Sequence, residues 1–434
     1  MAAIEGLTVS PMGRRVQVVL AAGIDRPVKG GTSDTYDLTI EGWAIGKEAP
    51  VEAVEAVSGG RVLQTVPVDR PTPRLEERFA AAGPGAAVAG FTMTLNTLTV
   101  EPEFDIRLRA IIGGEPLARI AAIKGRRKAI EPGYAPRLQP LMVTSLGRTG
   151  TTLLMTLLAA HPAIVAYRRY PYEARAAKYW LHLLKTLARP VDPTKRIGRP
   201  NEFHVEEQVV AGNPFASPAF GAYPEAAIWA GTGYLDRLAG FCMESIDGWY
   251  ERVAHAQEQE APVFYVEKGF PDDYAGLTRS LYPQGREIVL VRDFRDMWAS
   301  MRSFNERRGF GDFGQARAVS DQAWLDELRI GVHQLLEIVQ RNSERALVVR
   351  YEQLVTDPER VLGALLAALG LTADPATIAA MGAGAGAALE EHRTSANPAA
   401  SIGRWRRDLN EERQEVARAA FDDLLTAFGY DPEA

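Results

Sequence analysis

The chain has 434 residues, which is long for one domain and makes two domains the natural expectation. Hydrophobic residues make up 46% and charged residues 24%, as in an ordinary globular protein, and the net charge of -6 gives no indication of nucleic-acid binding. The single cysteine, Cys242, excludes an internal disulfide and a cysteine-clustered metal site. The sequence has no apolar run of the ~18–20 residues that a membrane span needs and no secretory signal pattern at its start, so we expect a cytoplasmic protein.

From about residue 15 to residue 123 the sequence has the pattern of β-strands. About seven segments alternate or run apolar at strand length, and turn signals such as Ser58-Gly59-Gly60 and Gly113-Gly114 separate them. We therefore predict an all-β sandwich domain over residues 1–124. It carries no catalytic constellation. We consider two roles for this domain. One is a structural or oligomerising role, which would make the protein a homo-oligomer, and the other is glycan binding.

Between Lys124 and Pro140 the composition becomes basic and then proline-rich. We predict a linker over residues 125–140, whose basic cluster is a solvated surface or, alternatively, part of an anion-binding cleft. Further along, helical segments alternate with short apolar strands, which predicts an α/β domain with a parallel sheet over residues 141–434. Its strands are expected at 141–143, 263–266, 287–291 and 346–349, and its helices at 173–188, 295–304, 321–343, 358–369 and 411–428.

The first strand of this domain leads into a glycine turn and then a helix. The apolar strand ends at Val143, the turn contains Gly147 and Gly150, and helical spacing of leucines begins at Thr151. The first amides of a helix lack internal partners and the helix dipole adds partial positive charge, so this layout binds anions. We interpret the turn as a phosphate-binding loop formed by Gly147, Arg148, Thr149, Gly150, Thr151 and Thr152.

The loop differs from two common nucleotide-binding motifs. The nucleoside-triphosphate P-loop needs a glycine where Ser145 stands and a lysine where Thr151 stands, and that lysine reaches the terminal phosphates. The dinucleotide pattern G-x-G-x-x-G fails because Gly147 and Gly150 are three residues apart with no third glycine. A kinase or GTPase interpretation is therefore weakened.

The run Arg148-Thr149-Gly150-Thr151-Thr152, followed by a leucine-rich helix and His161-Pro162, resembles the 5′-phosphosulfate loop of sulfotransferases that use 3′-phosphoadenosine 5′-phosphosulfate (PAPS). The resemblance implies a P-loop-like, three-layer α/β/α fold with a parallel sheet. It also implies PAPS as cofactor, adenosine 3′,5′-bisphosphate (PAP) as product and no requirement for a metal. Arg148 stands at the place of the family's catalytic basic residue, which stabilises the leaving phosphate.

A second phosphate motif follows the strand at 287–291. Arg292 at the strand end and Ser300 eight residues later can both reach one phosphate, the arginine through two parallel hydrogen bonds. The segment VRDFRDMWASM resembles the 3′-phosphate motif of the PAPS family, with Phe294 where proline is common. We therefore expect Arg292 and Ser300 to bind the 3′-phosphate.

Two later segments extend the resemblance, which covers about residues 140 to 430. The run that begins Arg350-Tyr351 resembles the family's R-Y-E-D-L segment, whose tyrosine lies near the nucleotide. The run 401–406 resembles the late S-x-G-R-W element that folds over the cofactor, which implies cofactor contacts for Gly403, Arg404 and Arg406. Animal cytosolic members grip the 3′-phosphate with a preceding Arg-Lys-Gly triplet. Here Pro-Ala-Ala occupies those places, so we expect Arg404 or Arg406 to substitute.

The implied reaction moves a sulfuryl group to an acceptor hydroxyl or amine and also needs a second cation and a base. Lys268, in a Glu-Lys-x-x-Pro setting, resembles the basic residue that contacts the sulfuryl group, with a solvated surface lysine as the alternative. Glu173 is the base that we favour, because it is the first acid after the loop helix. Asp272, Asp273 and His204 are the other candidates for the base.

The acceptor is less directly indicated. About 70 residues after the helix at 173–188 are expected to be irregular, and aromatic side chains within them, including Phe203, Phe215 and Phe220, suit stacking on sugar rings. The run Gly42-Trp43-Ala44 resembles a β-module found beside some bacterial glycosyltransferases and sulfotransferases. We expect a carbohydrate or glycolipid acceptor. The alternatives are a P-loop-type kinase or phosphotransferase, and a non-catalytic glycan-binding protein on a sulfotransferase fold.

Overall fold

The computed structural model describes residues 2–11, 18–79, 84–169, 172–188, 223–309, 313–314, 320–383 and 398–433. The chain divides into two compact units, each described by itself. The first comprises Met1–Tyr134 and Tyr179–Met243, and the second Ala135–Lys178 and Glu244–Ala434. The domain boundaries expected from the sequence, at residues 124 and 140, concern which parts of the chain fold independently, and they stay a prediction.

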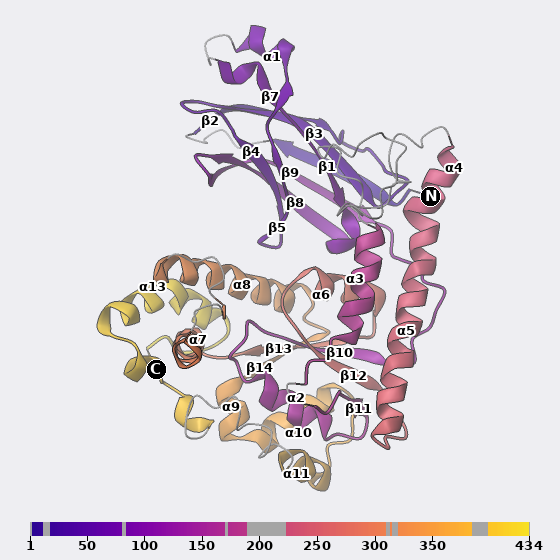
Figure 1. Ribbon diagram of the computed structural model, residues 1–434, viewed down its shortest axis with the longest axis vertical. Helices are drawn as coiled ribbons and strands as arrows, with labels where there is room; N and C mark the ends of the chain where they lie inside the picture. The colour runs from indigo at the N-terminus through magenta and orange to yellow at the C-terminus, as the bar shows by residue number, and fades with distance from the viewer. Residues whose placement is uncertain are drawn as a thin grey trace. The chain divides into compact units, whose positions relative to one another are not determined.

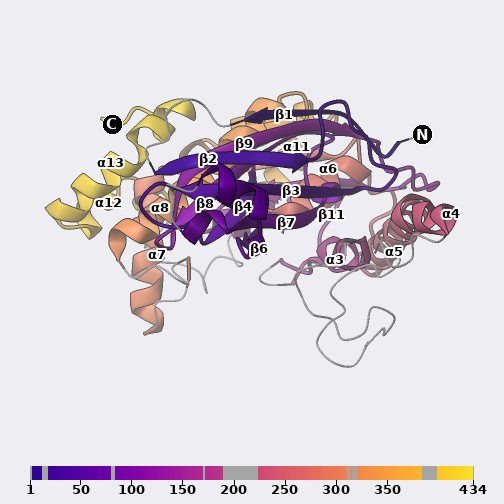
Figure 2. The same ribbon diagram turned by 90° about the horizontal axis from the view of Figure 1, so that it is seen from above.

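The first unit contains two antiparallel sheets, with strand orders β1-β9-β8-β4-β5 and β2-β3-β7-β6. Figure 2 shows β2, β3 and β7 running side by side. The predicted all-β region is therefore confirmed. Its strands are β1 (Ile4–Pro11), β2 (Val19–Arg26), β3 (Asp37–Gly46), β4 (Ala53–Ser58), β5 (Arg61–Pro67), β6 (Arg70–Pro71), β7 (Val88–Asn96), β8 (Glu103–Ile112) and β9 (Glu115–Arg127).

The two sheets bury one common core, as a sandwich does. Along β8 every second residue from Phe104 to Ile112 is buried, as the alternation predicts, and these side chains pack with residues of the other sheet such as Ile40 and Met93. The sequence pattern missed β1, because a register shift after Glu5 interrupts its alternation. The basic residues at the start of the predicted linker continue β9, where Arg126 pairs with Glu5 of β1 at 2.5 Å.

The second unit is built on a parallel sheet with the strand order β11-β12-β10-β13-β14. The central strand β10 therefore lies between β12 and β13, and the carboxyl ends of these three strands open onto the same edge of the sheet. That edge is where ligands bind in open α/β sheets. The strands are β10 (Gln139–Thr144), β11 (Ile164–Val165), β12 (Phe264–Gly269), β13 (Arg286–Val291) and β14 (Ala346–Arg350).

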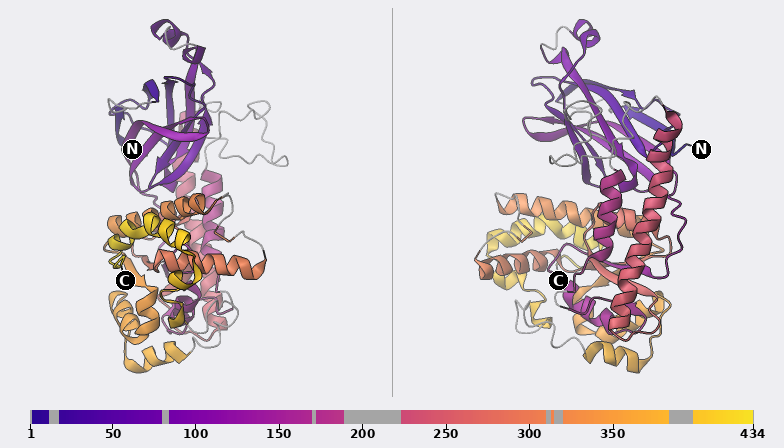
Figure 3. Two further views of the ribbon diagram at one scale, coloured as in Figure 1. Left: turned by 90° about the vertical axis from the view of Figure 1, so that its left-hand side faces the viewer. Right: turned by 45° about the vertical axis from the view of Figure 1, so that its right-hand side comes forward.

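Helices cover both faces of this sheet (Figure 1). Strand β13 is buried on both of its faces. Ile288 and Leu290 belong to the hydrophobic core that also contains residues of α2, α9, α10 and α11. Val289 and Val291 belong to the core that contains residues of α7, α8 and α13. Helices α8 and α13 lie side by side (Figures 1 and 3) and are joined by an Arg329–Asp423 ion pair of 2.6 Å. The predicted three-layer arrangement is confirmed.

The helices of the chain have the following bounds: α1 (Pro73–Arg78), α2 (Thr151–Ala159), α3 (Ala176–Ala188), α4 (Pro224–Ile228), α5 (Tyr234–Ala256), α6 (Asp273–Leu281), α7 (Phe294–Arg308), α8 (Asp321–Arg341), α9 (Tyr351–Thr356), α10 (Pro358–Ala368), α11 (Pro375–Ala383), α12 (Trp405–Asp408) and α13 (Glu411–Ala427). Among the described residues, no helix is long and apolar enough to cross a membrane.

Two expectations about the helices were wrong. The helix expected from Glu173 begins at Ala176, because Arg175 has a left-handed backbone (φ 50°) and the buried Glu267 carboxylate accepts the Ala177 N–H. Part of the segment expected to be irregular is the long helix α5, whose buried residues recur at helical spacing from Leu235 to Ile246. Aromatic side chains between these buried positions obscured the helical periodicity of the sequence. Phe203, His204, Phe215 and Phe220 lie outside the described residues.

Candidate functional site

The glycine turn after β10 has an unusual backbone. Gly147 (φ 95°), Arg148 (φ 51°) and Gly150 (φ 90°) all lie in the left-handed region, and α2 begins directly after them. Backbones of this kind turn successive amides toward one point and form anion-binding concavities. For Arg148, which has a side chain, the conformation is strained, and such strain concentrates at functional sites.

Gly150 is required by close packing as well as by its φ angle. A Cβ atom placed on it would lie 2.4 Å from Cδ2 of Tyr351, the first residue of α9. The Tyr351 hydroxyl donates to the Pro398 carbonyl at 3.0 Å and lies 3.0 Å from Oγ of Ser401. The tyrosine ring therefore lies against the glycine loop and reaches the segment near residue 400.

Arg292 follows the end of β13 and joins three parts of the chain. Its side chain is buried, Nη1 donates to the Arg148 carbonyl at 3.2 Å and Nη2 donates to the Ser401 carbonyl at 2.6 Å. Its guanidinium carbon lies 4.7 Å from the ring centroid of Tyr351. Its Nε is buried and has no hydrogen-bond partner among the described residues. The structure thus brings Arg292 beside the glycine loop, on the same side of the sheet.

Arg148 projects toward helix α7. Its Nε lies 3.4 Å from Oγ of Ser300, which is buried in that helix, and its guanidinium carbon lies 4.6 Å from the ring centroid of Phe304. Phe304 comes one helical turn after Ser300, so one face of α7 presents both side chains to Arg148.

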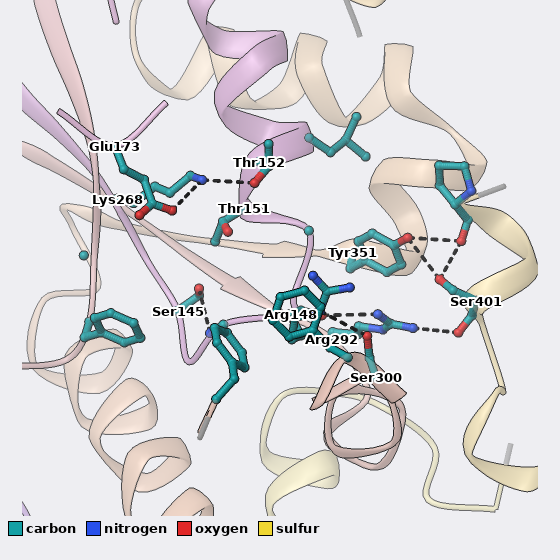
Figure 4. A pocket seen from close by; sticks show the side chains of 18 of the residues that line it. Ser145, Arg148, Thr151, Thr152, Glu173, Lys268, Arg292, Ser300, Tyr351 and Ser401 are labelled. Atoms are coloured by element: carbon teal, nitrogen blue, oxygen red, sulfur yellow. Dashed lines mark hydrogen bonds and ion pairs between the residues drawn. The ribbon is translucent and has the colours of Figure 1, made fainter. Parts of the chain in front are cut away.

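A second cluster of charges lies at the end of β12. Nζ of Lys268 donates to Oε1 of Glu173 at 2.9 Å and to Oγ1 of Thr152 at 3.0 Å, and Nη2 of Arg175 donates to Oε2 of Glu173 at 2.9 Å. Burial lowers the pKa of Lys268, although Glu173 opposes that shift. Figure 4 shows Glu173, Lys268 and Thr152 on one side of the loop, with Arg292, Tyr351 and Ser401 on the other.

These groups line one cavity of about 350 Å³, a volume typical of small-molecule sites. Most of the predicted site residues line it: Gly147, Arg148, Gly150, Thr151, Thr152, Glu173, Lys268, Arg292, Ser300 and Tyr351. Other lining residues had no role assigned from the sequence: Arg175, Phe270, Phe304, Phe313, Pro398 and Ser401. Phe304 could have been found from its helical spacing to Ser300, whereas Phe313 and Pro398 belong to segments without a period.

Comparison with known proteins identifies the family, because residues 140–375, more than half of the chain, match the model of the sulfotransferase family. The chain belongs to the sulfotransferase family. It is therefore a sulfotransferase, as the motifs of its second unit indicated.

Several solved sulfotransferase structures are similar to this chain. A sulfotransferase from Mycobacterium avium is 18% identical over 68% of this chain and 78% of its own, with a TM-score of 0.35. The sulfotransferase domain of the Synechococcus olefin synthase is 19% identical over 68% of this chain and 98% of its own, with a TM-score of 0.36. A mouse sulfotransferase complexed with PAP is 12% identical over 68% of this chain and 86% of its own, with a TM-score of 0.34. A search of curated proteins gave no match.

Four predicted cofactor contacts of this sulfotransferase do not line the cavity. Thr149 is buried beneath the loop, and its Oγ1 has no hydrogen-bond partner among the described residues. The Gly403 N–H donates to Asp296, Arg404 pairs with Asp408 at 2.5 Å, and Arg406 lies over the Trp405 ring. The expected substitution of Arg404 or Arg406 for the missing triplet therefore stays a prediction.

The other base candidates of the sulfotransferase lie away from the cavity lining where they are described. Asp272 caps α6 by accepting the Tyr274 and Ala275 amides and pairs with Lys178, and Asp273 is the first residue of α6. Among the described residues, no group of three or more His, Cys, Asp or Glu side chains could hold a metal ion.

Proposed function

We propose that the protein transfers the sulfuryl group of PAPS to a hydroxyl or amine of a carbohydrate or glycolipid acceptor. The observation that carries this proposal is the meeting of two cationic regions at one cavity. One is the Thr152 end of the glycine loop with Lys268, and the other is Arg292 with Ser300, next to which the Arg148 guanidinium lies. Two such regions suit a ligand with a charged group at each end.

The residues present fit PAPS. The left-handed loop before α2 leaves a concavity of amides suited to the 5′ end, with the hydroxyls of Thr151 and Thr152 beside it. The buried Nε of Arg292 has no hydrogen-bond partner in the described part of the chain and suits an anionic oxygen, which makes Arg292 and Ser300 the candidates for holding the 3′-phosphate.

PAPS supplies the chemistry: its sulfur–oxygen bond to the phosphate breaks as sulfur bonds to the acceptor oxygen or nitrogen, and PAP leaves. Arg148 and Lys268 stabilise negative charge that develops on the oxygens around this transfer. Glu173 accepts the acceptor proton, and its two ion pairs, with Lys268 and Arg175, hold both carboxylate oxygens in place. The transfer is expected to need no metal.

The acceptor class is supported by aromatic side chains. Phe270, Phe304 and Phe313 line the cavity, and rings of this kind stack on the apolar faces of sugars. The likeness of Gly42-Trp43-Ala44 to a β-module found beside glycosyltransferases is a second, independent indication of a glycan.

The proposal is tested by cofactor binding and then by transfer. PAP should bind in the presence of EDTA, whereas ATP with magnesium should bind weakly; the reverse preference would favour the kinase alternative. Radiolabelled PAPS should then label a component of a glycan and glycolipid panel or of a cell extract, which identifies the acceptor. PAP affinity without transfer to any acceptor would favour the non-catalytic alternative.

A further inference from the structure

Asp296 is a buried acid whose place in the site the sequence did not explain. It lies in the first turn of α7, four residues after Arg292 and four residues before Ser300, and its carboxylate is fully buried. Burial raises the pKa of Asp296 to about 6, Arg292 opposes that shift and Asp293 adds to it. An acid beside two phosphate-binding residues repels an anion, so its presence there needs a reason.

The reason lies in the two hydrogen bonds that the Asp296 carboxylate accepts. Oδ2 accepts the Gly403 N–H at 2.7 Å and Oδ1 accepts the Trp405 N–H at 2.9 Å. Both donors belong to the segment 398–408, here called the strap. The strap carries Trp405, which is fully buried, with the guanidinium carbon of Arg295 4.2 Å from its ring centroid.

The strap also contacts the cavity side chains directly. Nη2 of Arg292 donates to the Ser401 carbonyl at 2.6 Å, and the Tyr351 hydroxyl donates to the Pro398 carbonyl at 3.0 Å. Pro398 and Ser401 themselves line the cavity. One guanidinium nitrogen of Arg292 is therefore oriented by a strap carbonyl, and the strap is in turn held by Asp296.

We propose that Asp296 is a positioning residue for the 3′-phosphate end of the cavity, which rests on the proposed function. By fixing the strap it holds the Ser401 carbonyl against Arg292, so that the guanidinium plane is set before the cofactor binds. A pre-oriented arginine loses less side-chain entropy when it binds an anion, and this gain applies only to ligands that carry the 3′-phosphate.

The test compares two nucleotides on Asp296→Asn. Asparagine keeps the shape of aspartate, but its NH2 group is a hydrogen-bond donor. This group would face one of the two strap N–H groups, which is also a donor, so one hydrogen bond is lost. Isothermal titration calorimetry should show PAP affinity lowered about tenfold and the affinity for adenosine 5′-monophosphate unchanged. Asp247→Asn is the matched control, because Asp247 is also a buried carboxylate that accepts two backbone N–H groups, those of Arg137 and Leu138, but lies outside the cavity lining, and both affinities should stay at the wild-type value.

The outcomes separate this inference from the proposed function. Wild-type protein that binds PAP no better than adenosine 5′-monophosphate would overturn the cofactor arrangement itself. If Asp296→Asn keeps the full wild-type preference for PAP over adenosine 5′-monophosphate, only the positioning role is overturned. The same holds if the variant loses affinity for both nucleotides equally. If Asp296→Asn does not fold, Tyr351→Phe decides, since it removes the neighbouring strap contact; a selective loss of PAP affinity supports the positioning role, and unchanged preference contradicts it.

Discussion

Arg148 and Arg292 are close together, yet the chemistry assigns them different tasks. Arg148→Ala should lower kcat by about 10²–10³-fold, because charge on the leaving group loses its stabilising partner. Arg292→Ala should raise the KM for PAPS by about ten- to a hundredfold with a smaller change in kcat, because it removes a charged hydrogen-bond donor. Steady-state kinetics would measure both.

A surface arginine provides the control for these two variants. Arg360→Ala removes an exposed partner of Asp357 on α10 and should leave kcat and KM unchanged. Full activity in either Arg148→Ala or Arg292→Ala would contradict the assignment of the site.

Lys268 should set the alkaline limit of the reaction. Because burial lowers its pKa, Lys268 loses its proton at a lower pH than the ordinary lysine value of 10.5, and kcat at saturating PAPS should fall as pH rises through that lowered pKa. Lys268→Arg keeps the charge and should move the alkaline limb of the pH profile upward. Lys178→Arg, at a lysine that pairs with Asp272 outside the cavity lining, should leave it in place. An alkaline limb that is the same in all three proteins would exclude Lys268 as its source.

At the scale of elements, the junction of β10, the glycine loop and α2 depends on Gly150. Gly150→Ala should lower the free energy of unfolding by about 2 kcal/mol or more and weaken PAP binding, since it strains the backbone and forces a methyl group into the Tyr351 ring. Gly370→Ala is the matched control, because Gly370 has a φ of 68° but no atom within 4 Å of the added methyl group, so the substitution should cost only the backbone strain. Equal losses in chemical denaturation would show that the Tyr351 contact is unimportant.

The elements also show what the sequence could and could not reveal. The loop from Arg148 to Thr152 was predictable, because its glycines, hydroxyls and following helix are adjacent in the chain. The contact of Asp296 with Gly403 was not, because it joins residues 107 positions apart and leaves no periodic signal. Likewise, the start of α3 depends on Glu267, a buried carboxylate 90 residues away from Ala177, which no local propensity reports.

For the whole molecule, the hydrophobic cores indicate separate folding units. The first unit, here called the β unit, buries one core shared by its two sheets. The second unit, here called the α/β unit, buries cores on both faces of its parallel sheet, and these cores contain different residues. Differential scanning calorimetry should therefore show two unfolding transitions. PAP at a hundred times its Kd should stabilise one unit by about 2.7 kcal/mol and leave the other transition in place.

The variant Arg292→Ala shows which transition belongs to the α/β unit. At the same PAP concentration its ligand-induced stabilisation should fall to about half or less, because a Kd raised about ten- to a hundredfold leaves that concentration at only about one to ten times the Kd. Both transitions should stay separate without PAP. A single transition that PAP moves as a whole would show that the β unit and the α/β unit unfold together. In that case the β unit contributes to the stability of the enzyme, and its use as an independent glycan-binding module would lose support.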